Sequence, residues 1–267
     1  MSTQGFRRCA VVTGASSGLG EEFARQLAPG CKTLVLVARR GDRLEELARV
    51  LRAEHSGLEF GVIVADLTYP AAREHLVTKI AKAKLQPDLL INNAGMGDYG
   101  EFSEADWPKL ESMLKLNVEA LTYLSHALVP MMKEGGGGSI INVSSLASLL
   151  PIPDFAVYAA TKAYVTSFSE ALRIEVADHG IGVTALCPGP VHTGFGEVAM
   201  GEGRSNEFPG REFFYVDAKQ VVAEALEGAT ANRARVFPGW QIATAALIVS
   251  ALPIVLIRLA MGTRPRK

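Results

Sequence analysis

Two side chains that can exchange protons stand four residues apart, in a stretch with helical character. Tyr158 and Lys162 lie in the sequence Tyr-Ala-Ala-Thr-Lys, and residues at this spacing project from one face of a helix. A phenol has a pKa near ~10, but a neighbouring ammonium favours the phenolate, and a shift of two pKa units requires roughly 2.7 kcal/mol. We therefore expect Lys162 to lower the pKa of Tyr158 and make it a usable acid or base. A helix-surface pair without chemical function has the same spacing, so other motifs must distinguish a catalytic pair from a surface pair.

A glycine-rich segment near the N-terminus has the composition of a phosphate-binding turn. It reads Thr-Gly-Ala-Ser-Ser-Gly-Leu-Gly over residues 13–20, after the apolar run 9–12 and before the helix-like run 21–27. Glycines at a strand-to-helix turn let backbone N–H groups and the helix N-terminus approach a pyrophosphate closely. The residues expected to make this contact are Gly14, Ser16, Ser17, Gly18, Leu19 and Gly20.

Polar and glycine residues also follow two further strand-like runs. Asn-Asn-Ala-Gly at 92–95 ends the run 89–91, and Asn-Val-Ser-Ser at 142–145 ends the run 139–141. Ligands of open parallel sheets bind beyond such strand ends, so both segments are candidate ligand contacts.

Taken together, these motifs resemble those of the short-chain dehydrogenase/reductase family, and the resemblance extends from about Arg8 to about Val236. In that family a tyrosine, its lysine, a serine thirteen residues before the tyrosine and an asparagine on the preceding helix form the catalytic set. The matching residues here are Asn117, Ser145, Tyr158 and Lys162. The resemblance implies an oxidoreductase that moves a hydride between a nicotinamide cofactor and a carbonyl or alcohol carbon, while Tyr158 gives or takes the proton.

The same resemblance implies roles for the residues around the tyrosine and along the cofactor. Ser145 is expected to hydrogen-bond the carbonyl oxygen, Lys162 to hold the nicotinamide ribose, and Asn117 to seat a water that connects the lysine to solvent. The competing interpretations are a strand-end cap for the serine and a buried asparagine satisfied by backbone groups. The remaining implied cofactor contacts are Asp66 beside the adenine ring, Asn92, Ala94 and Gly95 along that pocket, and Pro188, Gly189, Val191 and Thr193 in the turn that holds the nicotinamide.

The end of the second strand-like run favours NADP over NAD. An acidic residue there would accept hydrogen bonds from the adenosine ribose and repel the 2′-phosphate, but position 38 is alanine. Arg39, with Arg40 as a second candidate, can pair with that phosphate. One charge-assisted contact contributes about 1.5–3 kcal/mol, which is roughly a tenfold to hundredfold preference. A solvated arginine pair that merely ends a strand is the alternative.

Alternating strand-like and helix-like segments predict an α/β fold: a doubly wound, Rossmann-like parallel sheet with helices on both faces, in a single domain. The expected strands beyond the first are 33–38, 60–65, 89–91, 139–143 and 182–187, and the expected helices are 42–54, 70–84, 106–133 and 156–179. Residues 1–237 are expected to form the NADP-binding catalytic domain, with a substrate lid at about 194–215, and residues 238–267 an apolar C-terminal tail helix.

Composition narrows the functional classes. The chain of 267 residues is 48% hydrophobic with a formal net charge of -1, so no global attraction to nucleic acid is expected. Cys9, Cys31 and Cys187 sit in or beside strand-like runs without Cys-x-x-Cys spacing. They are interpreted as buried reduced thiols, consistent with a cytoplasmic protein, and no metal site is expected.

An apolar small-molecule carbonyl or alcohol is the expected substrate. The segment after Ser145 and the expected lid are rich in apolar side chains, and the lid glycines suggest a loop that closes over the substrate. The helices expected at 106–133 and 156–179 carry more apolar residues than one core face needs. Because their counterparts in the resembling family pair across a two-fold axis, a homodimer or homotetramer is expected.

The tail contains an uncharged stretch from Val236 to Ile257, which as a helix would be long enough to cross a ~30 Å hydrocarbon layer. Pro253 and several polar residues shorten or kink that helix, and basic residues follow it. Peripheral membrane association or hydrophobic packing of the tail is therefore expected, rather than a transmembrane anchor.

Two other functions fit part of the pattern. An NADP-binding regulatory protein without turnover would share the fold but has no need for the four catalytic residues together. A sugar-nucleotide epimerase or dehydratase uses the same tyrosine and lysine, but it usually has a substantial C-terminal substrate domain, whereas 105 residues follow Lys162 here.

Overall fold

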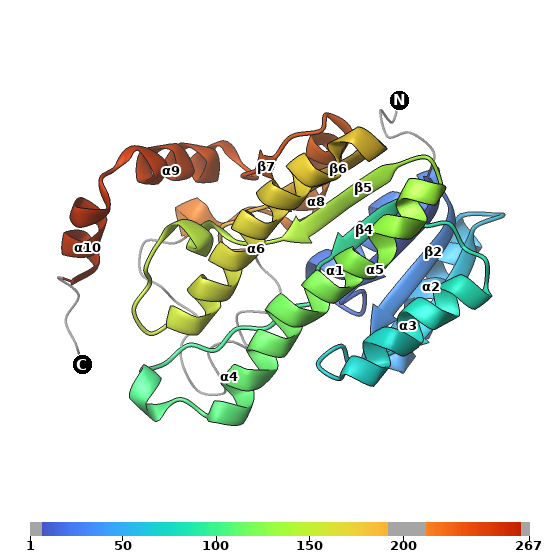
Figure 1. Cartoon of the computed structure of the whole chain (residues 1–267), viewed down its shortest axis with the longest axis horizontal. Helices are drawn as coiled ribbons and strands as arrows, with labels where there is room; N and C mark the ends of the chain where they lie inside the picture. Colours follow the sequence, from blue (N-terminus) through green and yellow to red (C-terminus); the bar gives the residue numbers. More distant parts are fainter. Residues whose placement is uncertain (1–6, 192–211, 263–267) are drawn as a thin grey trace.

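The structure is a computed structural model in which residues 7–191 and 212–262 are described. Within these residues, seven parallel strands form one sheet with the order β3-β2-β1-β4-β5-β6-β7 (Figure 1). The strands are β1 Arg7–Thr13, β2 Cys31–Ala38, β3 Glu59–Val64, β4 Leu89–Asn92, β5 Gly138–Val143, β6 Ile181–Leu186 and β7 Arg235–Val236. The doubly wound parallel sheet expected from the sequence is confirmed.

Helices cover both faces of this sheet (Figure 1). One face carries α1 (Gly18–Leu27), α2 (Gly41–Glu54) and α8 (Ala218–Thr230), and the other carries α3 (Pro70–Lys82), α5 (Leu121–Glu134) and α6 (Ala156–Glu175). Successive strand residues point to opposite faces, so Ala10 and Val12 of β1 join the core beneath α1, whereas Cys9 and Val11 join the core beneath α3. Burial on both faces explains why the strands read as continuous Val, Ile and Leu runs.

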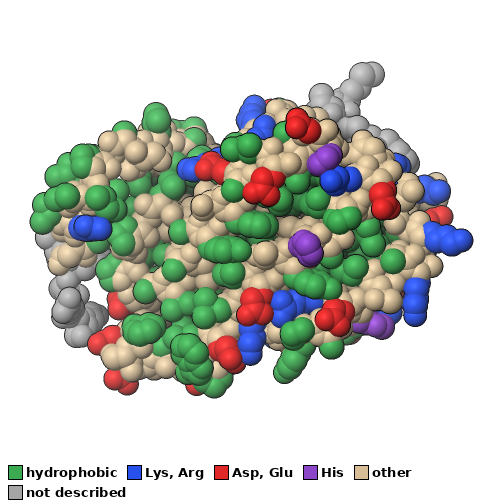
Figure 2. Space-filling model, in the orientation of Figure 1, with side chains coloured by type: hydrophobic (Ala, Val, Ile, Leu, Met, Phe, Trp, Pro, Cys, Tyr) green, Lys and Arg blue, Asp and Glu red, His purple; other side chains and the backbone are tan. Residues whose placement is uncertain are grey.

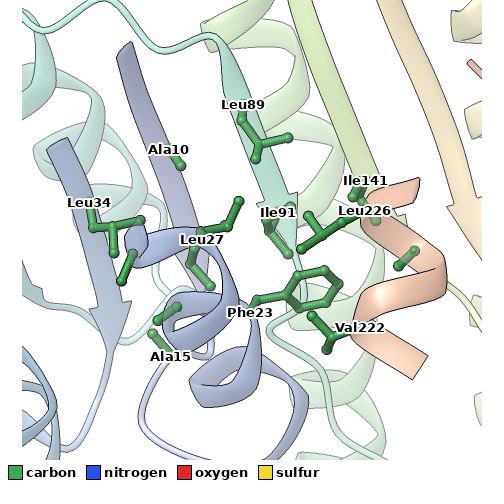
Figure 3. Packing of buried hydrophobic residues seen from close by; sticks show 14 of the residues in the cluster. Ala10, Ala15, Phe23, Leu27, Leu34, Leu89, Ile91, Ile141, Val222 and Leu226 are labelled. Carbon is green, nitrogen blue, oxygen red and sulfur yellow. The ribbon is translucent and has the colours of Figure 1, made fainter. Parts of the chain in front are cut away.

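Phe23 lies at the centre of the core beneath α1 and α8 (Figure 3). Its side chain is fully buried among Ile91 of β4 and Val222 and Leu226 of α8. Burying a side chain of this size contributes roughly 1.5–3 kcal/mol. This packing fixes the orientation of α1 and therefore of the glycine-rich turn at its N-terminus.

The chain changes direction across the sheet at β1. One edge of β1 pairs with β2 and the other with β4. The helices that follow β1 and β4 cover opposite faces, and in sheets of this kind ligands bind in the crevice beyond the carboxyl ends of two such strands. The motifs singled out in the sequence follow β1, β4 and β5 and therefore border this crevice.

The single helix expected at 106–133 is divided into three parts. α4 (Trp107–Leu114) begins after Asp106, whose carboxylate accepts a hydrogen bond from the Lys109 backbone N–H at 3.2 Å. A π-helical turn, Lys115–Ala120, then connects α4 to α5. A π-helical turn inserts one extra residue, which an apolar pattern with helical spacing does not reveal. The two-residue strand β7 was likewise too short to be predicted.

The three cysteines are free and buried, as expected. Burial raises the pKa of Cys9 and that of Cys31 to about 12.

The tail consists of two helices instead of one. α9 (Trp240–Ala251) and α10 (Ile254–Gly262) meet at 112°, and Pro253 lies between them. Proline cannot donate the backbone hydrogen bond that would continue α9, so the helix ends before it. Within the described ranges no single helix is long and apolar enough to cross a membrane, although the bent pair would be by length and composition alone.

Candidate active site

Tyr158 and Lys162 lie on α6, where it faces the end of β5. Both side chains are buried, and Lys162 Nζ donates a hydrogen bond to the Val143 carbonyl at 2.8 Å. Ser145 lies two residues beyond β5, and its side chain hydrogen-bonds that of Tyr158. Its hydroxyl also accepts a hydrogen bond from the Ala147 N–H at 3.1 Å, so the strand-end cap and the tyrosine contact coexist. The structure thus brings the tyrosine, the lysine and the serine together.

Asn117 comes from the π-helical turn and is almost completely buried. Its amide oxygen accepts a hydrogen bond from Met96 N, and its amide nitrogen donates to Met96 O, both at 2.9 Å. The same nitrogen donates to Thr161 Oγ1 at 3.1 Å, and Thr161 Oγ1 donates to the Tyr158 carbonyl at 2.7 Å. Asn117 therefore connects the segment after β4 to the helical turn that carries the tyrosine and the lysine.

The pKa of Tyr158 is raised, whereas the sequence predicted that Lys162 would lower it. Burial raises the pKa of Tyr158 to about 12, and the hydrogen bond from Ser145 opposes this effect. Lys162 Nζ lies 5.7 Å from the centroid of the Tyr158 ring and donates its hydrogen bond to a carbonyl instead. Burial also lowers the pKa of Lys162 to about 8, with a partial compensation from Cys187. Desolvation is the largest influence on the pKa of both groups, and spacing along a helix does not reveal desolvation.

Aromatic side chains form one wall beside the tyrosine. Phe155 stacks on the Tyr158 ring, with centroids 4.3 Å apart and an interplanar angle of 25°, and Tyr99 meets Phe155 edge to face at 5.8 Å. Met96 and Ile152 pack against the same small cluster. The surroundings of the phenol are therefore predominantly apolar.

The glycine-rich turn depends on the small size and the backbone freedom of its glycines. Gly14 and Gly18 adopt φ values of +67° and +56°, which residues other than glycine rarely adopt. A Cβ atom on Gly20 would collide with the carbonyl oxygen of Gly14. The turn is consequently packed closely against the first residues of α1, whose N–H groups have no partners within the helix.

Two residues that the sequence interpretation passed over hold this turn in place. Thr13 Oγ1 donates to the Ile91 carbonyl at 3.1 Å and accepts from the N–H groups of Asn93 and Ala94 at 3.0 Å each. Asn93 Nδ2 donates to the Thr13 carbonyl at 2.9 Å. Both residues stand in the quoted motifs, but their partners lie about eighty residues away along the chain.

Of the three residues expected to line the adenine pocket after β4, Asn92 points elsewhere. Its side chain is buried and donates to Asn142 Oδ1 at 2.9 Å and to Ser125 Oγ at 3.1 Å, so it links β4, β5 and α5 beneath the sheet. Ala94 contacts the glycine-rich turn through its backbone, as described above. A Cβ atom on Gly95 would lie 3.2 Å from Asn117 Oδ1 and 3.5 Å from Lys162 Nζ, so this strand end packs on the catalytic set.

The two arginines after β2 differ in their contacts. The Arg40 guanidinium donates to Ser16 Oγ at 3.0 Å and to Ser17 Oγ at 2.7 Å and thereby lies over the glycine-rich turn. Arg39 is exposed, and no hydrogen bond or ion pair of the described residues involves its guanidinium. Asp66 caps the turn after β3, because its carboxylate accepts from the Thr68 N–H and hydroxyl at 3.0 and 2.7 Å.

The segment after β6 lies beside the serine. The Pro188 carbonyl accepts a hydrogen bond from the Leu146 N–H at 2.8 Å, and a Cβ atom on Gly189 would collide with Ile242 of α9. Val191 forms an isolated parallel bridge with Val216. Thr193 and residues 194–211 of the expected lid lie outside the described residues.

Comparison with known proteins agrees with this arrangement. The family model described as short chain dehydrogenase matches residues 8–200. Sulfoacetaldehyde reductase 2 of Chromohalobacter salexigens is 33% identical over 196 residues, covering 72% of this chain and 75% of that protein. Inactive hydroxysteroid dehydrogenase-like protein 1 of Pongo abelii is 34% identical over 186 residues, covering 68% of this chain and 56% of that protein. The solved structure of a short-chain dehydrogenase from Sphingobium yanoikuyae in complex with NADPH superimposes with a TM-score of 0.81 at 31% identity, covering 97% of each chain.

The chain belongs to the short-chain dehydrogenase/reductase family. Membership places it among the oxidoreductases that transfer hydride between a nicotinamide cofactor and a carbonyl or alcohol group.

Proposed function

We propose that the protein is an NADP-dependent carbonyl reductase or alcohol dehydrogenase that acts on an apolar carbonyl or alcohol. The observation that carries the proposal is the meeting of Tyr158, Ser145, Lys162 and Asn117 at one strand end, beside the glycine-rich turn. An inert scaffold has no use for a buried tyrosine and a buried lysine in contact with each other, since burial of a lysine destabilises its charged form.

Each catalytic residue has a distinct role in this proposal. The raised pKa keeps Tyr158 protonated at neutral pH, so it can donate its proton to the carbonyl oxygen during reduction. Ser145 hydrogen-bonds the same oxygen as charge develops there, and Lys162 binds the nicotinamide ribose. Asn117 and Thr161 position the turn of α6 from which Tyr158 and Lys162 project. The nicotinamide supplies or accepts the hydride when it is bound.

Residues around the crevice fit NADP. The closely packed glycines and the N-terminus of α1 suit a pyrophosphate, and Ala38 leaves room for a 2′-phosphate where an acidic residue would repel it. Arg39 is free to approach that phosphate, while Arg40 lies over Ser16 and Ser17. The description of the similar Sphingobium protein as a complex with NADPH supports this choice.

We further propose that residues 1–237 act as the catalytic domain and that two copies pair through α5 and α6. An exposed stripe of small and apolar residues on α6 supports this pairing and includes Ala163, Tyr164, Ser167, Ala171 and Ile174. Ile174 is 79% exposed, which is unusual for so large an apolar side chain on a regular helix.

A binding protein without turnover is the second candidate, because one similar protein is described as an inactive hydroxysteroid dehydrogenase-like protein. NADPH oxidation measured against a panel of apolar ketones and aldehydes, with NADH in parallel, separates the two. We expect turnover of at least one carbonyl with NADPH. Tight NADPH binding without oxidation by any carbonyl, and without reduction of NADP by the corresponding alcohols, would favour the binding protein.

A further inference from the structure

Large apolar side chains cover the outer surface of α9 and α10. Figure 2 shows hydrophobic side chains gathered over these two helices at the left of the molecule. The most exposed members are Trp240 (68%), Leu247 (72%), Ile248 (55%), Val255 (58%), Leu256 (50%) and Leu259 (63%). Phe213, which is 56% exposed, meets Trp240 edge to face at 5.5 Å and extends the same surface. Soluble monomers rarely leave so many large apolar side chains contiguous and exposed.

The inner side of α9 is firmly attached to the catalytic domain. Ile242 is fully buried in the core beneath α8 and contacts Gly189 of the segment after β6. At the start of the helix, the Glu224 carboxylate accepts hydrogen bonds from the Gly239 N–H at 3.1 and 3.2 Å. The apolar outer surface is therefore held at a fixed position next to the expected nicotinamide turn.

The charges of this end of the chain favour an anionic partner. No acidic side chain follows Glu227, whereas six basic residues do: Arg233, Arg235, Arg258, Arg264, Arg266 and Lys267. Arg233 and Arg235 form ion pairs with Glu227 and Glu170. Arg258 of α10 is exposed, and it takes part in no ion pair of the described residues. An apolar surface that carries an exposed arginine, in a basic end of the chain, matches the boundary between acyl chains and anionic headgroups.

The dimensions of the helices exclude spanning in this conformation. α9 and α10 contain 12 and 9 residues, which corresponds to roughly 18 and 14 Å, against ~30 Å for a hydrocarbon layer. The 112° bend turns them away from a common axis. Trp240 at the start of α9 is of the residue type that collects at membrane interfaces.

We propose that α9 and α10 lie in one leaflet of an anionic membrane and hold the catalytic domain against its surface. α9 packs on the segment that carries Gly189, and this segment lies beside Ser145. The candidate active site is then held near the bilayer, and lipid-dissolved carbonyl compounds are the substrate class. The substrate part rests on the proposed function, whereas the membrane part does not.

Vesicle flotation of the full-length protein tests the membrane part. We expect binding to vesicles in which about a third of the phosphatidylcholine is replaced by phosphatidylserine, and weaker binding to phosphatidylcholine alone or at high salt. The double variant Leu247→Glu/Val255→Glu changes two exposed residues and should bind about tenfold or more weakly. Tyr69→Glu is the matched control, since Tyr69 is 65% exposed beside β3 at the other edge of the sheet, and it should bind like the wild type.

Three outcomes would overturn the membrane part. The first is wild-type protein that stays unbound at every lipid concentration. The second is a larger mass in light scattering that the double variant reduces, because a second copy would then occupy the apolar surface. The third is retention in the membrane fraction after alkaline carbonate washing, which indicates a spanning segment.

Kinetics with two ketones test the substrate part. The double variant should keep kcat/KM for a short water-soluble ketone and lose about tenfold or more for a long-chain ketone dissolved in vesicles. Equal values for wild type and variant with the vesicle-bound ketone would refute membrane delivery. If the wild type oxidises NADPH with neither ketone, the proposed function fails, and flotation still decides the membrane part.

Discussion

Tyr158 lies between two groups that act on it in opposite ways. Phe155 covers one region of its ring and helps to exclude water, while Ser145 donates a hydrogen bond that favours the phenolate. The balance leaves the pKa of Tyr158 raised, which suits a proton donor in carbonyl reduction.

Replacing Tyr158 by phenylalanine tests this role directly. Tyr158→Phe keeps the ring that stacks on Phe155 and removes the acidic proton. NADPH affinity should therefore remain near the wild-type value, while kcat falls by several orders of magnitude, as measured by NADPH binding and steady-state kinetics. Tyr164→Phe, the same change on the same helix, is the control and should stay active. Substantial activity of Tyr158→Phe would rule out the assignment.

The burial of Lys162 has a measurable effect on stability. Because its pKa falls from 10.5 to about 8 on folding, the unfolded chain binds more protons between these pH values, and this residue makes stability rise with pH across that window. The free energy of unfolding of Lys162→Met should thus be about 1–3 kcal/mol higher than that of the wild type at pH 7, while activity is lost. The gain should shrink toward pH 10, as followed by urea denaturation without cofactor. A difference between variant and wild type that does not change with pH would contradict the buried charge.

Substitution of the two arginines after β2 should affect the affinities for NADPH and NADH differently. Arg39→Ala should weaken NADPH binding by roughly tenfold or more and leave NADH nearly unchanged, because only the 2′-phosphate contact is removed. Arg40→Ala should weaken both cofactors, since Arg40 donates to Ser16 and Ser17 in the turn that would hold the shared pyrophosphate. Equal losses of NADPH and NADH affinity in Arg39→Ala would refute the phosphate contact.

Residue spacing predicted the contacts that follow from local geometry. The four-residue and thirteen-residue intervals correctly brought Lys162 and Ser145 to Tyr158. Spacing could not predict that Asn93 supports Thr13 or that Asn92 points under the sheet, because both depend on how distant strands align. It also predicted the wrong direction for the pKa of Tyr158, because desolvation depends on the completed fold.

At the scale of elements, the sequence predicted strands and helices wherever the apolar pattern was long and regular. It missed the π-helical turn, which is the element that carries Asn117, and it predicted one shortened or kinked tail helix where the structure has α9 and α10. Pro253 indicated a kink. The packing of α9 on the catalytic domain could not be predicted, because it depends on the contact between Ile242 and Gly189, which are distant in the sequence.

Truncation distinguishes the two tail helices. Removal of residues 252–267 deletes α10 and leaves the core contact of Ile242 intact, so the Tm should change little. Removal of residues 240–267 also deletes this fully buried side chain, at a cost of about 2–5 kcal/mol, and should lower the Tm clearly. Differential scanning calorimetry of both proteins checks the difference. Indistinguishable Tm values would show that α9 does not belong to the core.

At the scale of the whole molecule, the exposed stripe on α6 predicts the assembly. Light scattering should give at least twice the chain mass of 28.5 kDa. Ile174→Glu should shift this mass toward the monomer, because it places a charge in the proposed helix contact, whereas Leu247→Glu on α9 should not. A wild-type monomer at all concentrations would contradict pairing through α6.

β1 lies inside the sheet, between β2 and β4, although β4 follows it only much later in the chain. Its register with β4 joins Ala10 to Leu89, so one edge of β1 has no partner until some eighty further residues have been made. At a synthesis rate of about 5–20 residues per second, that edge waits for roughly 4–16 seconds, apart from the time spent in the exit tunnel. The nascent chain can pair β1 with β2 early, but the pairing of β1 with β4 forms late. We therefore expect β1, with its unpaired edge, to be the segment most dependent on chaperones during synthesis of the chain.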